Sequence, residues 1–289
     1  RFFVVEGCEY RANMLHLEPE MIVLTNIEED HLDYYRDLDN IQETFQTFVD
    51  KLKSKGLVVL NADDVVSQKL SVNRSVKYGS NGTNMTYTLL HRTTKQGEQT
   101  VTTNHGELRL KIPGAFNAMN ALAAVAAALE LGVPFETCRR VLADFTGIWR
   151  RFERVGTWKG ADVISDYGHH PTAVRQTIEA AREFFPGQRI VLCYQPHQHD
   201  RTKKLFNEFV ESLALADHLV LTEIYDVAGR NENASVSSRD LVKEINRSNT
   251  TYAPDLLAAE SQLRDLVKPN DVILIMGAGD IDDLARRLV

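Results

Sequence analysis

Short continuous apolar runs and one helical stripe organise the beginning of the chain. The runs at 2–5, 22–24 and 57–60 are typical of strands that a parallel sheet buries on both faces. Between the last two runs, over 40–50, apolar residues recur at the spacing of a helix that buries one face. These elements predict a sheet covered by at least one helix.

The next segment changes from apolar runs to β-rich pieces and then to helices. Residues 75–111 hold short β-rich pieces separated by Asn, Gly and Thr, a pattern that predicts hairpins. Apolar periodicity then predicts helices over 117–131 and 134–144, and Gly132 lies where the first of them should end.

From about residue 150 onward, apolar runs alternate regularly with helical stretches. Strands are expected at 162–165, 189–193, 218–221 and 272–276. Helices are expected to begin near Pro171, Thr202, Ser238, Asp255 and Asp280. This alternation is typical of βαβ units and predicts a complete doubly wound, Rossmann-like domain over 150–289, after a first domain over 1–149. The fold class is therefore α/β.

Composition and charge exclude several classes of protein. The chain has 289 residues, which is enough for two hydrophobic cores. Its formal net charge of −7 argues against a general nucleic-acid binder, because phosphate contacts need clustered Lys and Arg. The Ala-rich stretch at 118–131 is too short to span a bilayer. Three cysteines without ligand or disulfide spacing indicate a reducing compartment, so we expect a cytoplasmic protein with no nucleic-acid or membrane partner.

One loop concentrates more chemistry than packing requires. Asp-Tyr-Gly-His-His-Pro-Thr at 166–172 follows an apolar run and precedes an amphipathic stretch, which predicts a strand, a tight loop and a helix. Open α/β sheets bind their ligands in such loops, at the carboxyl ends of the strands. A single histidine here would be explained by helix capping. A carboxylate, a phenol and two imidazoles together indicate a functional site.

Two further segments suit nucleotide chemistry. Asn117 and Asn120 are three residues apart and therefore share one face of the expected helix. A side-chain amide offers both a donor and an acceptor, which suits the edge of a purine. The acidic loop at 25–31 contains one histidine and follows a strand, where carboxylates can bind a divalent cation. Taken alone, these features also fit helix capping and an ordinary solvated loop.

Several motifs occur together and in order, and they resemble the Mur ligase family. They are Thr-Asn-Ile-Glu-x-Asp-His at 25–31, Gly-x-x-Asn-x-x-Asn at 114–120, Gly-x-x-x-Arg-Phe at 147–152, Asp-Tyr-Gly-His-His-Pro-Thr at 166–172, Gln-Pro-His-x-x-x-Arg-Thr at 195–202 and Gly-Ala-Gly-Asp-Ile at 277–281. The resemblance implies the central ATPase domain of that family followed by its amino-acid-binding Rossmann-like domain.

The resemblance also implies roles for individual residues. In the first domain, Glu6 and His31 would hold Mg²⁺, and Asn117 and Asn120 would contact the adenine. Arg151 would face the ATP phosphates, because guanidinium binds phosphate bidentately, whereas Arg150 is assigned to the surface.

In the second domain, the family's pattern assigns the two loops to nucleotide and amino acid. Asp166 would contact the ribose or phosphate side of ATP, and His169 and His170 would lie near the phosphates and the incoming amino acid. His197 and Arg201 would face the amino-acid carboxylate, which needs a cation or N–H groups. His31, Arg151 and His170 are thus the expected catalytic residues.

The activity implied is an ATP- and Mg²⁺-dependent ligase of peptidoglycan synthesis that joins L-alanine to UDP-N-acetylmuramate through an acyl phosphate. Two alternatives remain open, a ligase that attaches a recycled tripeptide to the same sugar nucleotide and a non-catalytic binding module derived from a ligase. The chain is expected to be a monomer or a weak homodimer. It begins inside an apparent strand and contains no Gly-x-x-x-x-Gly-Lys-[Ser/Thr] loop, so we expect an upstream phosphate loop and UDP-binding domain to be missing and this chain alone to be inactive.

Overall fold

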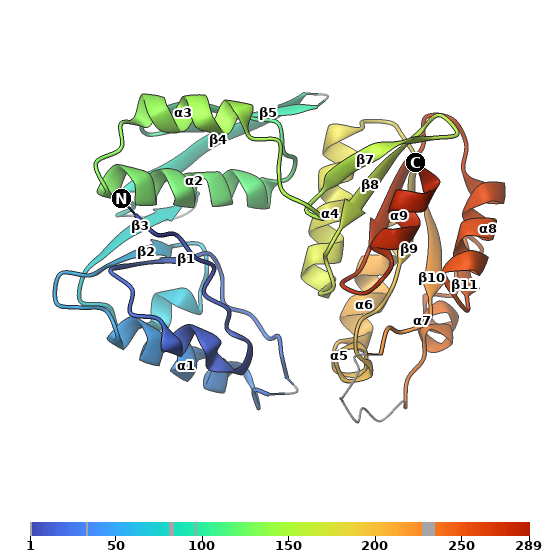
Figure 1. Ribbon diagram of the computed structural model, residues 1–289, viewed down its shortest axis with the longest axis horizontal. Helices are drawn as coiled ribbons and strands as arrows, with labels where there is room; N and C mark the ends of the chain where they lie inside the picture. Colours follow the sequence, from blue (N-terminus) through green and yellow to red (C-terminus); the bar gives the residue numbers. More distant parts are fainter. Residues whose placement is uncertain (1, 33, 81–83, 96, 227–234) are drawn as a thin grey trace. The chain divides into compact units, whose positions relative to one another are not determined.

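The computed structural model describes residues 2–32, 34–80, 84–95, 97–226 and 235–289. The chain divides into two compact units (Figure 1). The first unit comprises Arg1–Thr93, Thr100–Leu110 and Phe116–Asp144, and the second comprises Thr94–Gln99, Lys111–Ala115 and Phe145–Val289.

The first sheet contains six strands that follow one another in chain order (Figure 1). They are β1 (Met21–Leu24), β2 (Leu57–Asn61), β3 (Ser75–Gly79), β4 (Tyr87–Lys95), β5 (Glu98–Thr103) and β6 (Gly106–Leu110). Strands β1, β2 and β3 run parallel, with Leu24 opposite Leu60 and Asn61 opposite Tyr78. Because parallel strands point the same way, the loops that follow these three strands leave the same edge of the sheet.

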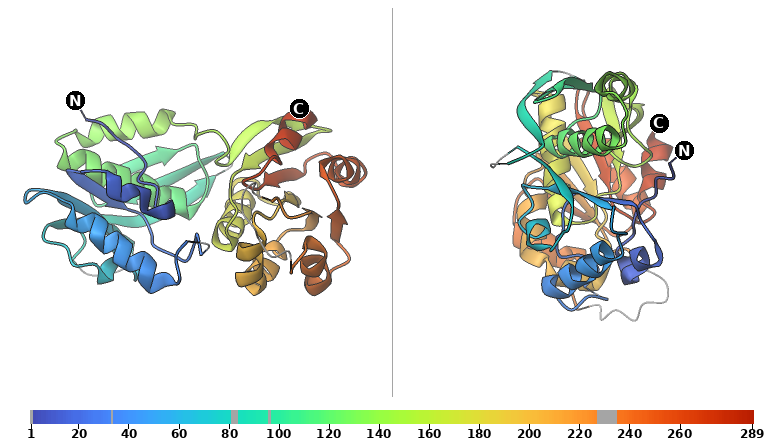
Figure 2. Two further views of the ribbon diagram at one scale, coloured as in Figure 1. Left: turned by 60° about the horizontal axis from the view of Figure 1, so that its bottom comes forward. Right: turned by 90° about the vertical axis from the view of Figure 1, so that its left-hand side faces the viewer.

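Helices cover both faces of the parallel part of this sheet (Figures 1 and 2). The helices are α1 (Leu38–Asp50), α2 (Ala115–Glu130) and α3 (Phe135–Asp144), with 3-10 helices η1 (Tyr10–His16) and η2 (Ser67–Lys69). Phe48 of α1 packs in one core with Val58, whereas Leu122 of α2 packs in another core with Val59. Neighbouring residues of a strand point to opposite faces, so α1 and α2 lie on opposite sides of β2.

The structure confirms the predicted strands at 22–24 and 57–60 and the helix over 40–50, but the strand predicted at 2–5 is wrong. Residues 2–9 form no regular element, and Phe3 and Val4 are 89% and 90% exposed. A strand is stabilised by hydrogen bonds to a neighbour, and none of the described strands pairs with this segment. An apolar run alone therefore did not determine a strand.

The second sheet is the doubly wound sheet that the alternating pattern predicted. Its order is β11-β10-β9-β12-β8-β7, and all neighbours are parallel except β7 and β8. The strands are β7 (Glu153–Trp158), β8 (Ala161–Asp166), β9 (Ile190–Tyr194), β10 (His218–Thr222), β11 (Thr250–Ala253) and β12 (Val272–Met276). The two edge strands, β7 and β11, were not predicted, because edge strands lack the continuous apolar runs of buried ones.

Helices cover both faces of the second sheet as well (Figure 1). They are α4 (Pro171–Phe184), α5 (His199–Lys204), α6 (Phe206–Leu213), α7 (Ser238–Ile245), α8 (Leu256–Leu266) and α9 (Asp282–Leu288). Ile178 of α4 shares a core with Leu274, whereas Leu284 of α9 shares the opposite core with Ile275. Within the described residues, no helix combines the length and the apolar character needed to cross a bilayer.

Candidate functional site

Three strand ends of the second sheet lie level with one another and form the edge that carries the candidate site. Met276 at the end of β12 is opposite both Asp166 of β8 and Tyr194 of β9. The N–H of Gln195 donates to the carbonyl of Met276 at 2.9 Å, and the N–H of Gly277 donates to the carbonyl of Asp166 at 3.1 Å. The loops after β8, β9 and β12 therefore leave the sheet together, where doubly wound folds bind ligands.

Asp166 is buried and holds backbone in place. One of its carboxylate oxygens accepts the N–H of Phe152 at 2.8 Å, and the other accepts the N–H of Gly168 at 2.7 Å. Burial raises the pKa of this carboxyl group, and the two N–H donors oppose the rise. Both oxygens thus accept backbone hydrogen bonds that fix the loop at 166–172, and the expected contact of Asp166 with the ribose or phosphate side of ATP stays a prediction.

The two adjacent histidines have different positions. His170 is the N-cap of α4, and its Nδ1 accepts the N–H of Thr172 at 3.3 Å, with Pro171 in the first turn. His169 lies with its Nδ1 3.3 Å from the carbonyl of Tyr167 and its ring 6.1 Å from the ring of His197. The histidine that meets the next loop is therefore His169, while His170 caps the helix.

The loop after β9 contributes an imidazole, and the helix that follows it, α5, contributes a buried guanidinium. Arg201 is only 6% exposed, and its Nη1 lies 3.3 Å from the carbonyl oxygen and 3.4 Å from Nδ1 of His197. We call His169, His197 and Arg201 the His–Arg cluster. His169 lies in the loop after β8, His197 in the loop after β9 and Arg201 in α5, and the pairing of His197 with Arg201 agrees with their shared prediction as substrate-binding residues, which itself stays a prediction. A buried cation beside two imidazoles suits a carboxylate ligand.

The structure contradicts the surface assignment of Arg150. This residue is 8% exposed, its guanidinium donates to the carbonyls of Gly277 and Gly279, and it lies 4.9 Å from the ring centre of Tyr167. Arg150 thus fastens the loop after β12 to the loop after β8. Arg151 is exposed and lies 5.2 Å from the same ring, so of the pair it is the guanidinium that solvent and an anion can reach. The sequence alone did not indicate which of the two adjacent arginines would be buried.

In the first unit, His31 meets Glu9 instead of Glu6. Nε2 of His31 lies 3.1 Å from a carboxylate oxygen of Glu9 and 4.0 Å from one of Asp30, whereas Glu6 is exposed and is not brought to His31. The hydrogen bond to His31 lowers the pKa of Glu9, although burial opposes the shift. His31 also has a positive φ of 53°, which is uncommon for a residue with a side chain. The shared binding of Mg²⁺ by Glu6 and His31 that the resemblance implies stays a prediction, and in this structure the carboxylate against His31 is that of Glu9.

The described residues around His31 do not form a complete metal site. The residues that the structure describes contain no group of three His, Cys, Asp or Glu able to hold a metal ion. Nδ1 of His31 is nevertheless buried without a hydrogen-bond partner. Because Mg²⁺ takes most of its ligands from phosphates and water and only one or two from protein, this donor set fits a nucleotide-bound ion and does not fit a purely protein-bound one.

Two residues that the sequence reasoning missed hold the loop that leads to His31. Asn61 donates from Nδ2 to the carbonyl of Thr25 at 2.6 Å, and Asp64 accepts the N–H of Ile27 at 3.2 Å. Asp64 also accepts the N–H of Ser67. The available signal was an Asn at the end of the buried strand β2 and an Asp three residues later, at the same sheet edge as the loop after β1.

The paired amides of α2 share a face as predicted. Nδ2 of Asn120 lies 3.5 Å from Oδ1 of Asn117, and Asn120 is exposed. The helix begins at Ala115, two residues before Asn117, so Asn117 lies within its first turn and is not its N-cap. The amide pair is therefore on the helix surface, and no capping role accounts for it.

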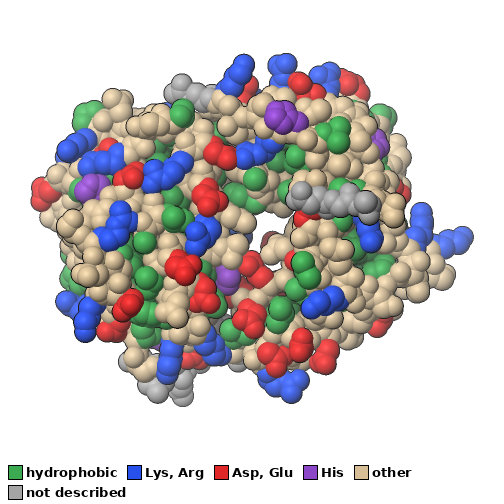
Figure 3. All heavy atoms as spheres, turned by 180° about the vertical axis from the view of Figure 1, so that it is seen from behind, with side chains coloured by type: hydrophobic (Ala, Val, Ile, Leu, Met, Phe, Trp, Pro, Cys, Tyr) green, Lys and Arg blue, Asp and Glu red, His purple; other side chains and the backbone are tan. Residues whose placement is uncertain are grey.

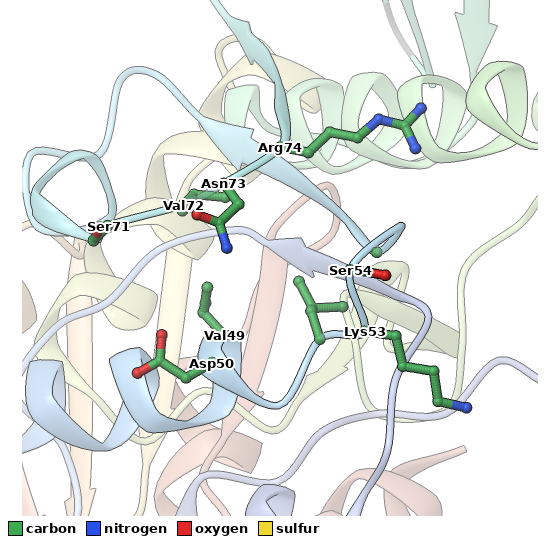
Figure 4. Close-up of a pocket in the computed structure, with 10 residues that line it drawn as sticks. Val49, Asp50, Lys53, Ser54, Ser71, Val72, Asn73 and Arg74 are labelled. Carbon is green, nitrogen blue, oxygen red and sulfur yellow. The ribbon is translucent and has the colours of Figure 1, made fainter.

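The first unit also has a pocket of about 100 Å³ lined by residues of the turns that precede β2 and β3 (Figure 4). Lys53, Gly56 and Arg74 lie at its wall, and Asp50 faces it from the end of α1. These turns lead into the amino ends of the parallel strands, opposite to the edge that carries His31. We therefore assign the pocket no part in the candidate site.

The distribution of surface charge is consistent with a binding site that depends on a few local side chains. On the face shown in Figure 3, Lys and Arg side chains are interspersed with Asp and Glu over the coloured residues. Any recognition of phosphate or carboxylate on that face therefore depends on individual cations.

Comparison with known proteins places both units in one family. The model of the Mur ligase middle domain matches residues 1–128, and that of the Mur ligase glutamate ligase domain matches residues 150–279. The chain is 38% identical to the UDP-N-acetylmuramate–L-alanine ligase of Desulforamulus reducens and 39% identical to that of Trichlorobacter lovleyi. All of this chain is covered in both cases, together with 64% and 66% of those relatives, so it spans just under two thirds of their length.

A solved structure agrees with these sequence matches. The UDP-N-acetylmuramate-alanine ligase MurC of Thermotoga maritima superposes with a TM-score of 0.77 at 30% identity, over 96% of this chain and 60% of that protein. The family models, the sequence matches over the whole of this chain and the similarity of fold all indicate the same family. The chain belongs to the Mur ligase family.

Proposed function

We propose that this protein is an ATP-dependent ligase that joins L-alanine to UDP-N-acetylmuramate in peptidoglycan synthesis. The observation that carries the proposal is the His–Arg cluster at the carboxyl edge of the second sheet, in which His197 lies between His169 of the preceding loop and the buried guanidinium of Arg201 in α5. Relatives with 38% and 39% identity carry that activity in their names. The cysteines at positions 8, 138 and 193 are free thiols, which supports a cytoplasmic reaction.

The chemistry requires activation of a carboxylate. A carboxylate oxygen of UDP-N-acetylmuramate attacks the γ-phosphorus of ATP, ADP leaves, and an acyl phosphate forms. The neutral amine of L-alanine then attacks the acyl carbon, phosphate leaves with that oxygen, and the nitrogen loses a proton to solvent or to the departing phosphate as the amide bond forms. Because ATP supplies the leaving group, the protein contributes mainly by positioning the reactants and neutralising charge.

In this proposal, the second unit recognises the amino acid. Arg201 binds the carboxylate of L-alanine, and His197 and His169 lie beside it within the same cluster. Arg151, exposed at the start of the unit, neutralises phosphate, and His170 supports the loop as the cap of α4. Asp166 contributes by fixing that loop.

The first unit would hold the nucleotide. Asn117 and Asn120 present their amides to the adenine from one face of α2. His31 would hold a magnesium ion together with one carboxylate, either Glu9, which lies against it, or Glu6 from the same segment. When bound, the ion neutralises phosphate charge.

Phosphate release by the full-length protein tests this function. The assay contains UDP-N-acetylmuramate, ATP and Mg²⁺, with L-alanine, the tripeptide L-Ala-γ-D-Glu-meso-diaminopimelate or no amine. We expect release that depends on L-alanine. Release that depends on the tripeptide and not on L-alanine would assign the protein to tripeptide recycling. If neither amine causes phosphate release, a non-catalytic binding module is favoured.

A further inference from the structure

Tyr225, in the loop after β10, packs against His197. The two rings are stacked, with centroids 5.7 Å apart and planes 9° from parallel. The backbone of Tyr225 is hydrogen-bonded to the residues on either side of His197. Its N–H donates to the carbonyl of Pro196 at 2.8 Å, and its carbonyl accepts the N–H of Gln198 at 3.2 Å. Residues 197 and 225 thereby form an isolated parallel bridge, which fixes the ring and the backbone of His197 together.

Gly279 also lies against Tyr225, and its lack of a side chain leaves room for the tyrosine ring. A Cβ at Gly279 would lie 2.6 Å from Cγ of Tyr225 and 2.4 Å from Oε1 of Gln195. The end of a glutamine side chain can move aside, but Cγ is the rigid root of the tyrosine ring. The loop after β12 is itself held by Arg150, which donates to the carbonyl of Gly279 at 3.1 Å. Any side chain at 279 would therefore displace Tyr225.

The backbone at this point is under conformational constraint. Gln198, which follows His197, has a φ of 73°, a left-handed value that few residues with side chains adopt. Such a conformation persists where surrounding contacts determine it, and it occurs at ligand-binding sites. Here the hydrogen bond from Gln198 to Tyr225 is one of those contacts. Tyr225 thus determines both the ring plane of His197 and the turn that leads to Arg201.

We propose that Tyr225 is a positioning residue for amino-acid recognition, which orients His197 by ring stacking and does so only because residue 279 is glycine. The inference rests on the proposed function, since it takes the His–Arg cluster to bind the amino acid. Stacking against the tyrosine ring favours one orientation of the His197 ring over others. The phenol oxygen has no part in this role, so the ring alone should suffice.

The first test is spectroscopic and needs no activity. The full-length protein is labelled with [13C-ε1]histidine, and the His197 signal is identified by its loss in His197→Asn. The face of an aromatic ring shields a stacked proton, so Tyr225→Leu and Gly279→Ala should both move the His197 signal downfield, whereas Tyr225→Phe should leave it in place. An unchanged signal in a folded Tyr225→Leu variant would overturn the stacking role.

The second test is kinetic and separates positioning from general damage. We expect Tyr225→Leu and Gly279→Ala to raise the KM for L-alanine about 10- to 100-fold while the KM for ATP and the melting temperature stay close to wild type. Tyr225→Phe should restore the wild-type KM. Equal effects on both KM values would contradict the proposal. If the wild-type protein shows no alanine-dependent phosphate release, the proposed function fails, and the histidine spectrum still decides the role of Tyr225.

Discussion

The loop that carries His31 and the loops that carry the His–Arg cluster leave the same kind of sheet edge but are held differently. In the second unit, Arg150 and Asp166 fasten the loops with buried hydrogen bonds to backbone, and residues far apart in sequence meet. In the first unit, Asn61 and Asp64 fasten the loop after β1, but the acidic segment before η1 is exposed and pairs with no described strand. Of the two glutamates in this segment, Glu9 lies against His31 and Glu6 is exposed.

The difference indicates what makes a binding loop rigid. Strands β8, β9 and β12 each have neighbours on both sides, so their ends are fixed by the ladder and their loops start from defined positions. The segment at 2–9 has no such neighbour. The His–Arg cluster therefore lies entirely within the second unit, whereas the carboxylates near His31 include those of a segment that pairs with no described strand. Four predictions can break or sharpen this comparison.

The largest expected effect is at His31. We expect His31→Ala in the full-length protein to lower alanine-dependent phosphate release about 100- to 1000-fold, the range found when one charge-stabilising group is removed. Glu9→Gln and Glu6→Gln form a matched pair that identifies the carboxylate partner, and the Mg²⁺ concentration for half-maximal rate is measured in each. Wild-type turnover in His31→Ala would exclude His31 from the site.

The next largest effect is on the stability of the second unit. Arg150→Leu leaves the carbonyls of Gly277 and Gly279 without their donor, so the free energy of unfolding should fall by about 2–3 kcal/mol. Arg151→Leu is the matched control, because Arg151 is exposed, and its effect should stay within about 0.5 kcal/mol. Denaturant unfolding measures both. Equal losses in the two variants would mean that the Arg150 contacts do not hold the loops.

A smaller effect is expected at Arg201. Replacement by Lys keeps the charge but loses the planar fork that binds a carboxylate bidentately, so the KM for L-alanine should rise about tenfold. The KM for ATP should not change. Lys203, on the same helix, provides the control substitution Lys203→Arg, which should leave both constants unaltered. A rise in the ATP constant instead would assign Arg201 to the nucleotide.

The smallest effect concerns an ion pair at the start of the second unit. Glu153 accepts two hydrogen bonds from Arg286, at 2.8 and 2.6 Å, and this contact lowers the pKa of Glu153. Because the pair is partly exposed, Glu153→Gln should cost about 1 kcal/mol at pH 7. A carboxyl whose folded pKa is lowered stabilises the fold above its unfolded pKa and loses that contribution as the pH falls. Unfolding at pH 7, 5 and 3.5 should therefore show a difference that is constant down to about pH 5 and then shrinks. A difference that persists at pH 3.5 would contradict the ion pair.

The sequence predicted the elements whose patterns are local. The apolar run at 272–276 became β12 with the same bounds, and Pro171 began α4 after a capping His170, because these signals lie within a few residues. The sequence analysis placed His169 and His197 in two loops that follow parallel strands, and the carboxyl ends of such strands lie at one edge, which agrees with their ring distance of 6.1 Å.

Features that depend on distant partners could not be predicted in this way. The burial of Arg150 depends on carbonyls more than 120 residues away, and the contact of Glu9 with His31 depends on how an irregular segment folds back. The position of Tyr225 depends on the absence of a side chain at Gly279 in a different loop. A single sequence contains these residues but does not indicate which of them meet.

Oxygen transfer from substrate to phosphate tests the central claim most directly. UDP-N-acetylmuramate labelled with 18O in its carboxylate is incubated with the full-length protein, ATP, Mg²⁺ and L-alanine, and the released phosphate is analysed by mass spectrometry. If ATP activates the carboxylate as an acyl phosphate, each phosphate formed with L-alanine should carry one 18O atom. Unlabelled phosphate released during L-alanine-dependent turnover would contradict the proposed ligase.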